Sequence, residues 1–358
     1  MESPRLQFLD NYVGSDERIP QGDNDRLLRR LYETTCYQTT DNYDFTPKSC
    51  CLGSESNPHF DEREAAKENI RAEIRRYKKL KQLFARTEEI PILQGIDYEL
   101  LTVGNRPVVI GEGKFGVAFL AKDTRTNKVV TIKLFKKKGN LKTLNILKEV
   151  GFQMVINKES ESSFSPRLLG LLIFMESKVP PNCHSFMLVM EYLSILPEMA
   201  KPMKLSLSDA IKFQKEGCDV LSERNWAGIC KQVIEITKEL SEMKIAHLDL
   251  HAHNLLLVFE QSEVTVKVID FGTCALLDGN ARLIGFDKTK SLLYGKELAA
   301  LGRPLHTSDL FSVSAHILVI YRKVLKRQDA VNIVDRFRKQ PFGSRWNHYQ
   351  LFSRLKMQ

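Results

Sequence analysis

The chain has 358 residues, of which 43% are hydrophobic and 27% charged, and its formal net charge is +9. These ordinary values exclude a wholly disordered chain, a collagen and a disulfide-stapled miniprotein. No apolar run approaches the roughly 20 residues that span a bilayer, and the first residues lack the pattern of a secretory signal. Cysteines at irregular spacing are typical of reduced thiols. We therefore expect a cytoplasmic or nuclear protein without membrane contact, folded as one large or two modest domains.

The first hundred residues divide into two segments. Residues 1–60 are polar with little periodicity, so we expect a largely irregular N-terminal extension. Across residues 61–97 apolar side chains recur at helical spacing, at Ile70, Ile74, Tyr77 and Phe84. We predict one amphipathic basic helix from about Glu62 to Arg86. Its lysines and arginines are interpreted as a solvated face; binding of something acidic is the alternative.

The remaining elements follow in two groups. Residues 98–193 are rich in strand patterns, at 107–110, 118–122, 129–135, 168–174 and 186–191, with a helix at 141–157. Residues 194–325 are mostly helical, at 207–215, 226–243 and 308–325, with two short strands at 254–259 and 264–269. Strands early and helices late predict an α+β fold of two lobes, a small β-rich one and a larger helical one.

A glycine-rich turn lies between the first two strong strand patterns. Gly111, Gly113 and Gly116 are spaced so that backbone N–H groups can approach a phosphate without interference from Cβ atoms. Alone the pattern is weak. A dinucleotide-binding fold requires a helix directly after the glycines, and here a strand follows, so that fold is not expected.

A charged pair is predicted from the cost of burial. Lys133 lies in an apolar strand, where an unpaired ammonium group is unfavourable and a partner is expected. Glu149, sixteen residues later on a predicted helix, is the natural partner. For either residue alone, an exposed surface charge is the ordinary interpretation.

The most informative motif is His-Leu-Asp-Leu-His-Ala-His-Asn at residues 247–254, followed by Asp-Phe-Gly at 270–272. It brings the carboxylates of Asp249 and Asp270 and the amide of Asn254 onto a loop and the end of a strand. Such a set suits one general base and a magnesium site, because Mg²⁺ prefers oxygen ligands, few of them from the protein.

These motifs, in this order, resemble those of the protein kinase superfamily over about residues 103–325. The resemblance implies ATP and Mg²⁺ as cofactors, with Asp249 as catalytic base and Lys133 and Glu149 as the ion pair that positions phosphates. It implies Asn254 and Asp270 as metal ligands. It further implies that the nucleotide contacts Gly111, Gly113, Gly116, Ala118, Thr131, Lys133, Met190, Glu191 and Leu193. Asp309 would bond to the backbone of the catalytic loop.

Several positions depart from the family pattern. Leu248 stands where the family carries an arginine that binds a phosphorylated activation loop, so we expect activity without activating phosphorylation. His251 replaces a lysine near the transferred phosphate. Ala118 is smaller and Thr131 larger than the family's usual valine and alanine, which predicts compensating volumes around adenine. The short C-terminal lobe is similar to that of divergent viral kinases, herpesvirus-type enzymes among them.

The leading hypothesis is a serine/threonine protein kinase, a transferase that moves the γ-phosphoryl group of ATP to protein hydroxyls. One alternative is a pseudokinase that serves as a binding module. The other is a small-molecule kinase, because the pattern Asp-Leu-His-x-x-Asn is also similar to aminoglycoside phosphotransferase-like enzymes. Residues 326–358 form a basic C-terminal segment, interpreted as a solvated helix or a contact for an acidic partner. Nucleic acid is not an expected partner.

Overall fold

The computed structural model describes residues 38–39, 60–93, 97–103, 106–113, 115–137, 143–173, 182–193, 205–217, 221–260, 263–277, 308–339, 351 and 353–355. The chain divides into two compact units. The first comprises Met1–Asn157 and Pro166–Lys204, and the second comprises Lys158–Ser165 and Leu205–Gln358. A mixed α/β unit and a mostly helical one agree with the predicted α+β fold.

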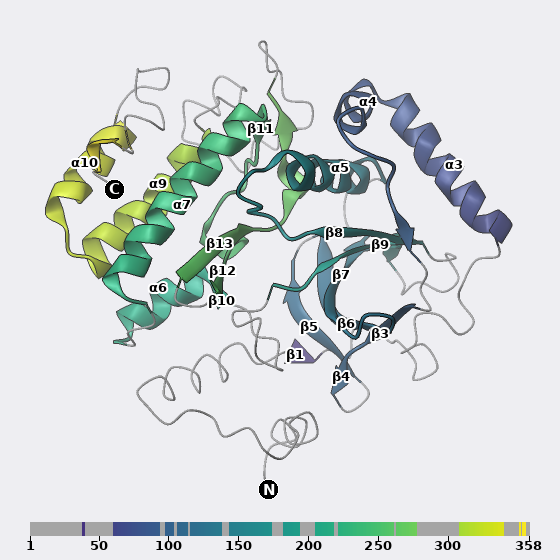
Figure 1. The fold of residues 1–358 in the computed structure, drawn as a ribbon, viewed down its shortest axis with the longest axis horizontal. Helices are drawn as coiled ribbons and strands as arrows, with labels where there is room; N and C mark the ends of the chain where they lie inside the picture. The colour runs from purple at the N-terminus through teal and green to yellow at the C-terminus, as the bar shows by residue number, and fades with distance from the viewer. Residues whose placement is uncertain are drawn as a thin grey trace, which may run out of the picture. The chain divides into compact units, whose positions relative to one another are not determined.

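A nine-stranded sheet of described residues is the framework of the first unit (Figure 1). Its main path runs through β1 (Gln38–Thr39), β5 (Arg106–Glu112), β6 (Gly116–Asp123), β7 (Val129–Lys136), β9 (Cys183–Glu191), β8 (Leu168–Ile173) and β2 (Ile92–Leu93). Off this path, β3 (Tyr98–Leu100) pairs with β6 and β4 (Thr102–Val103) with β5. Apart from β1, the N-terminal extension predicted to be irregular lies outside the described residues.

A tight turn at residues 123–128 joins β6 to β7. The Asp123 carboxylate accepts hydrogen bonds from the backbone N–H groups of Arg125, at 2.9 Å, and Thr126, at 3.2 Å. The Asp123 N–H donates to the carbonyl oxygen of Lys128. Aspartate favours such turns because its short side chain bonds to the backbone that follows it.

Apolar side chains cover both faces of this sheet, because successive residues of a strand point to opposite sides. One cluster includes Val117 and Phe119 of β6 with Ile132 and Leu134 of β7. On the other face Phe135 and Leu188 pack with α5 (Thr143–Glu159). The helix predicted at 141–157 is therefore present, although residues 141 and 142 lie outside the described part.

Two helices occupy the segment where the sequence predicts one. They are α3 (Phe60–Arg76) and α4 (Lys78–Phe84). The prediction of one continuous helix is wrong at Tyr77, because the backbone there is extended, with φ −112° and ψ 117°. The break lets Leu80 and Leu83 reach the core, where they are almost fully buried, and burial of apolar side chains outweighs the local preference for continuing a helix.

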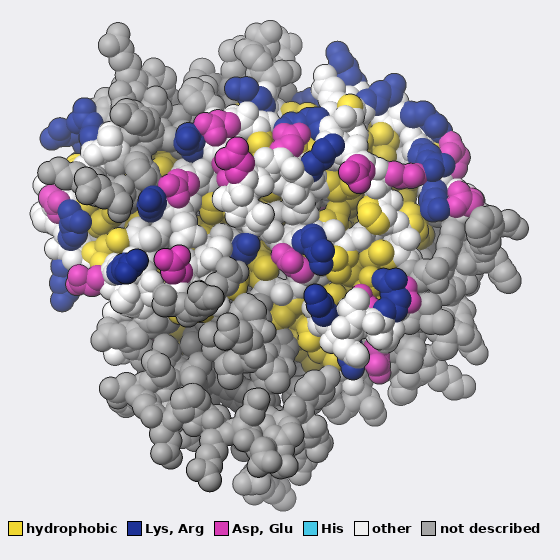
Figure 2. Space-filling view, in the orientation of Figure 1, with side chains coloured by type: hydrophobic (Ala, Val, Ile, Leu, Met, Phe, Trp, Pro, Cys, Tyr) yellow, Lys and Arg dark blue, Asp and Glu magenta, His cyan; other side chains and the backbone are white. Residues whose placement is uncertain are grey.

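The outer side of α3 is a solvated charged face. Arg71 and Arg75 are exposed and form ion pairs with Glu68, and Arg76 pairs with Glu73. Figure 2 shows basic and acidic side chains mixed along this helix. Neighbours three and seven positions apart share one side of a helix and neutralise one another there, in line with the solvated interpretation.

The described residues of the second unit form four α-helices and two small sheets. The helices are α6 (Leu207–Lys215), α7 (Glu223–Glu242), α9 (Ser308–Val319) and α10 (Gln328–Lys339). One sheet is β10 (Leu205–Ser206), β12 (Leu255–Glu260) and β13 (Glu263–Val268), and in the other β11 (Ile245–Ala246) pairs with β14 (Ala275–Leu276). The helix predicted to reach residue 325 ends earlier, in a π-helical turn η7 (Ile320–Val324).

Helices α6 and α7 begin where polar side chains cap them. Ser206 and Asp209 form a reciprocal capping box at the start of α6, and Ser222 accepts the Asn225 N–H at the start of α7. The apolar side of α7 is buried, through Trp226, Ile229, Val233, Ile236 and Leu240.

Helix α10 packs against α9. The guanidinium group of Arg338 donates to the Phe311 carbonyl and the Ser314 hydroxyl oxygen, both at 2.8 Å, and lies 4.4 Å from the Phe311 ring centroid. Val334 and Phe337 are buried beside it. The apolar side of α10, within the predicted basic C-terminal segment, thus contributes to the core of the second unit. The domain boundaries after residues 60, 97, 193 and 325 stay predictions.

Two further expectations concern membranes and thiols. Within the described ranges, no helix combines the length and the apolar character needed to cross a bilayer. Cys183, Cys230 and Cys274 are buried, and burial raises the pKa of Cys183 and Cys230. Raised thiol pKa values disfavour the reactive thiolate.

Candidate active site

One face of the first unit's sheet gathers four of the predicted nucleotide-contacting residues. Ala118 lies opposite Lys133, and Thr131 lies opposite Met190. Directly opposed residues share a face of the sheet, and so do residues two apart in one strand. Ala118, Thr131, Lys133 and Met190 therefore lie on one face, the same face against which α5 packs.

Ala118 and Thr131 are diagonal rather than directly opposed neighbours. Thr131 lies opposite Leu120 in the ladder, and its side chain is buried. Diagonal neighbours lie roughly 7–8 Å apart between Cα atoms. Volume compensation between Ala118 and Thr131 stays a prediction. It would act through a ligand that contacts both residues on this face of the sheet, because the two side chains are not direct neighbours.

Within the glycine-rich turn, Gly116 is a position where close packing excludes a side chain. Gly111 lies near the end of β5, Gly116 begins β6, and the Gly113 N–H donates to the Gly116 carbonyl at 2.9 Å. A Cβ on Gly116 would lie 2.8 Å from the Leu134 carbonyl oxygen and 3.4 Å from Cε of Lys133. Glycine is thus needed at 116 because a Cβ would clash with the backbone of β7, while its distance to the lysine would be an ordinary contact. A Cβ on Gly113 would meet nothing within 4 Å.

The predicted ion pair is present. Nζ of Lys133 in β7 lies 2.5 Å from Oε1 of Glu149 in α5, and the two side chains are 16% and 7% exposed. An ion pair this well buried is screened little by solvent. Lys133 also lies 5.4 Å from the Phe135 ring centroid. The pair holds an ammonium group in place beside the glycine-rich turn, where it can attract a phosphate.

The two remaining predicted contacts lie at the end of β9. The Glu191 carboxylate accepts the Arg167 N–H at 2.8 Å, and the Glu191 N–H donates to the Arg167 carbonyl at 2.9 Å. This side chain is therefore engaged by the protein's own backbone. Leu193 is half-buried, two residues beyond the strand. A nucleotide contact by either residue stays a prediction.

In the second unit, Asp309 of α9 fixes the start of the catalytic loop. Its carboxylate accepts the backbone N–H groups of His247, at 2.7 Å, and Leu248, at 2.9 Å. This confirms the bond predicted from the family resemblance. Burial raises the pKa of Asp309, while the nearby His247 and the two hydrogen bonds lower it. Leu248 is buried with a left-handed backbone, φ 64°, an unfavourable conformation that these bonds help to maintain.

Asn254 ties the two ends of the loop together. Its Nδ2 donates to the Asp249 carbonyl oxygen at 2.9 Å, its N–H donates to the His251 carbonyl, and its own carbonyl accepts the Ile269 N–H. Because Nδ2 is used in the hydrogen bond to the loop backbone, the amide oxygen is the side-chain atom left to bind a ligand. Oxygen is the ligand that a hard cation prefers, so the orientation fits a metal ligand.

Asp270 follows β13 and is exposed, with a left-handed backbone, φ 66°. The next residue, Phe271, is buried against His247, with ring centroids 5.5 Å apart. Thr273 Oγ1 donates to the His247 carbonyl at 2.8 Å. These contacts attach the Asp-Phe-Gly segment to the catalytic loop within one unit.

The surroundings of His251 favour its neutral form. Burial lowers its pKa, and the Asp249 carboxylate, 3.9 Å from His251 Nε2, opposes this shift. Its Nδ1 atom is buried without a hydrogen-bond partner among the described residues. His251 therefore does not supply the fixed positive charge that a lysine would.

Sequence reasoning missed His316, whose Nε2 accepts the Ala252 N–H at 3.1 Å. Ala252 is buried, so its N–H requires an acceptor inside the protein. Burial lowers the pKa of His316 to about 4, and the neighbouring His251, Arg338 and His253 add to this shift. The available signal was its position seven residues after Asp309 on an apolar helix, which places both residues on one side of α9.

The protein kinase domain family matches residues 105–332, well over half of the chain. The chain belongs to the protein kinase family. It is 28% identical over 174 residues to the serine/threonine-protein kinase shk1/pak1 of Schizosaccharomyces pombe, covering 48% of this chain and 22% of that protein. It is 26% identical over 230 residues to the dual specificity tyrosine-phosphorylation-regulated kinase 2 of Drosophila melanogaster, covering 63% of this chain and 27% of that protein. The kinase thus spans about a quarter of the length of these relatives, or less. The resemblance to viral kinases stays a prediction.

The stability of this kinase is expected to fall between pH 6.5 and about 4 because of His316. Its pKa of about 4 lies below the 6.5 of an unperturbed histidine, so the unfolded chain binds the proton first as the pH falls. The contribution of His316 to the free energy of unfolding is fully present above pH 6.5, and it decreases by ~3 kcal/mol as the pH falls toward 4. His316→Gln keeps an acceptor for Ala252 but does not titrate. Urea unfolding of both proteins at several pH values should show a flatter acid limb for the variant; parallel limbs would contradict this assignment.

Proposed function

We propose that this kinase is an active enzyme that transfers the γ-phosphoryl group of ATP to serine or threonine hydroxyls of protein substrates. The observation that carries the proposal is that every chemical group needed for phosphoryl transfer is present in the chain. The first unit contains the Lys133–Glu149 ion pair beside a glycine-rich turn. The second contains Asp249 and Asn254 on one hydrogen-bonded loop, with Asp270 attached to it.

Each group has a distinct role in the proposed reaction. Lys133, held by Glu149, and the backbone N–H groups around Gly111, Gly113 and Gly116 bind phosphate oxygens. Asp249 orients the acceptor hydroxyl and takes its proton while the oxygen attacks the γ-phosphorus and the bond to ADP breaks. The rate enhancement comes mainly from positioning and electrostatic stabilisation.

Asn254 and Asp270 are the proposed magnesium ligands. The amide oxygen of Asn254 and the carboxylate of Asp270 are the hard oxygen ligands that Mg²⁺ takes, with phosphates and water filling the other positions. When bound, the ion neutralises the charge that develops on the phosphates. The hydrogen bond from Asn254 Nδ2 to the Asp249 carbonyl supports this role, because it orients the amide oxygen away from the loop.

The neutral His251 favours one alternative, a small-molecule acceptor. A protein kinase of the usual pattern has a lysine at this position, and the sequence Asp-Leu-His-x-x-Asn is similar to that of small-molecule kinases. A pseudokinase remains the other alternative, since bound nucleotide alone would serve a binding module. The three functions differ in where labelled phosphate appears.

Phosphate transfer by the full chain should therefore be measured with γ-labelled ATP. The acceptors are a peptide array with serine, threonine and tyrosine, and a set of aminoglycosides. We expect label on serine and threonine peptides, with phosphatase pre-treatment leaving the rate unchanged because the buried Leu248 carries no charge to bind a phosphorylated loop. Label confined to the aminoglycosides would establish the small-molecule enzyme. ATP binding without transfer to any acceptor would establish the pseudokinase.

A further inference from the structure

Residues 60–93, here called the brace segment, precede the part of the chain that matches the kinase family and yet share its core. Leu80 of α4 and Ile90 are buried in one apolar cluster with residues of α5 and of the sheet. The members from α5 and the sheet are Ile146, Leu147, Val150, Phe135, Leu171 and Leu188. Figure 1 shows α3 and α4 on the side of the sheet that α5 covers. The segment is therefore built into the first unit rather than appended to it.

A glycine on α5 receives helix α4. A Cβ on Gly151 would lie 2.6 Å from Cδ2 of Leu83 and 3.1 Å from Cζ of Phe84. Leu83 is almost fully buried, so it has little freedom to move aside. Residues two apart on an α-helix point about 200° apart, so Gly151 lies on nearly the opposite side of α5 from Glu149. Helix α5 is thus held between Lys133 on one side and α4 on the other.

A second glycine, on β8, receives the end of the brace segment. Ile92 of β2 pairs with Leu171 of β8, and the Leu171 N–H donates to the Pro91 carbonyl at 2.8 Å. Gly170 has φ +150°, and a Cβ there would clash with the Pro91 carbonyl oxygen and lie 2.9 Å from Cγ of Leu93. Two glycines inside the family-matched region therefore leave space that the brace segment fills.

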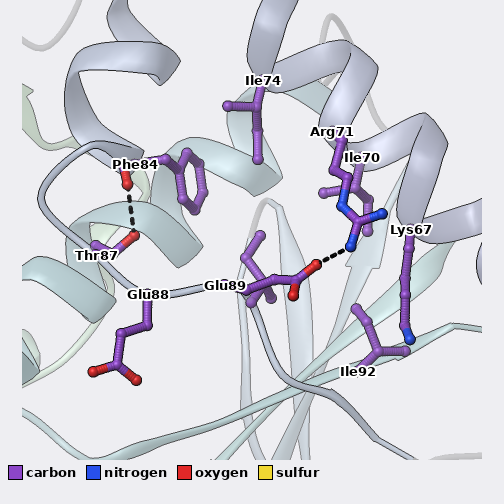
Figure 3. Close-up of a pocket in the computed structure, with 10 residues that line it drawn as sticks. Lys67, Ile70, Arg71, Ile74, Phe84, Thr87, Glu88, Glu89 and Ile92 are labelled. Atoms are coloured by element: carbon purple, nitrogen blue, oxygen red, sulfur yellow. Dashed lines mark hydrogen bonds and ion pairs between the residues drawn. The ribbon is translucent and has the colours of Figure 1, made fainter.

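Helix α3 reaches the same apolar cluster through the buried Ile70. An open pocket of about 380 Å³ lies between α3 and residues 87–92, with Ile70, Ile74 and Phe84 on its apolar wall (Figure 3). An ion pair from Arg71 to Glu89 crosses it. The close approach to Gly151 of α5 is made by α4, and Leu83 is the side chain to test.

We propose that the brace segment positions Glu149 for nucleotide binding by holding α5 from the side away from Lys133. Movement of Glu149 away from Lys133 requires α5 to displace Leu83 from its buried place. Leu83 and Gly151 are positioning residues, because they act through Glu149 and Lys133. The proposal rests on the proposed function, in which the Lys133–Glu149 pair holds the phosphates of ATP.

The test is a double-mutant cycle in the full chain: Gly151→Ala, Leu83→Ala and both together. The matched control is Gly228→Ala in α7, where an added Cβ would meet nothing within 4 Å. Affinity for a fluorescent ATP analogue, kcat/KM for ATP and the thermal midpoint are measured for each protein. We expect Gly151→Ala to weaken nucleotide affinity and kcat/KM by about tenfold, and Gly228→Ala to leave both unchanged. Once Leu83 is shortened, Gly151→Ala should have little additional effect.

The thermal midpoint separates positioning from simple destabilisation. Alanine favours a helix more than glycine does, so Gly151→Ala should lose more nucleotide affinity than its midpoint explains. If Gly151→Ala does not fold, Leu83→Ala is the test. It should also lose nucleotide affinity, because it loosens the same helix α5. Unchanged nucleotide affinity in folded variants, or losses that simply multiply in the double variant, would overturn the proposal alone. A wild-type chain that binds no nucleotide would overturn the proposed function as well.

Discussion

Replacing Asp249 by asparagine is expected to lower kcat by about 10²- to 10⁴-fold, the usual contribution of a general base. The amide has nearly the same shape but cannot take the proton of the acceptor hydroxyl. Two hydrogen bonds of residue 249 use its main chain: its N–H donates to His247 Nδ1, and its carbonyl accepts from Asn254 Nδ2. The loop should therefore keep its conformation, and ATP affinity should stay within about twofold.

Steady-state kinetics and binding of an ATP analogue measure the two effects separately. Asp329→Asn is the matched control, because it makes the same change at an exposed ion pair with Arg327 and should leave kcat unaltered. An Asp249→Asn protein that retains wild-type turnover would show that another group accepts the proton. Equal losses in affinity and turnover would instead indicate a collapsed loop.

Breaking the Lys133–Glu149 pair is expected to affect stability and activity in different ways. Lys133→Met leaves a carboxylate that is 7% exposed without its ammonium partner, and should lower the free energy of unfolding by about 3 kcal/mol. The double variant Lys133→Met/Glu149→Leu removes both charges, and apolar replacement of a buried pair is usually close to neutral. It should recover most of the stability while nucleotide affinity and turnover stay lost.

Urea unfolding and ATP-analogue binding of the wild type, single and double variants test this separation. Lys238→Met breaks an exposed pair with Glu242 on α7 and serves as the control, with an expected change below about 1 kcal/mol. A double variant that binds nucleotide as well as the wild type does would contradict the role of Lys133. A single variant as stable as the wild type would contradict the burial argument.

Residues that obey a local rule could be predicted from the sequence. The Lys133–Glu149 pair follows from the cost of burying an ammonium group in an apolar strand, and the structure has it at 2.5 Å. Strand patterns in the sequence predicted β6 and β7, and a helical pattern predicted α6 at residues 207–215. The α+β fold followed from the order of these elements.

Features that depend on tertiary contact could not be predicted in this way. The break at Tyr77 arises because Leu80 and Leu83 are buried against other elements, which no local periodicity reveals. Gly151 resembles any helical glycine until Leu83 is placed beside it. His316 acts on a backbone N–H 64 residues away, and spacing alone does not identify that partner.

Transfer of the γ-phosphoryl group to a serine peptide by the full chain tests the central claim most directly. Wild type and Asp249→Asn are purified identically and incubated with ATP and Mg²⁺, and phosphoserine is quantified over time by mass spectrometry. The proposed mechanism predicts that phosphoserine accumulates with the wild type at a rate at least about 10²-fold above that of the variant. Equal rates in the two samples, or no phosphoserine from a wild-type chain that binds ATP, would contradict it.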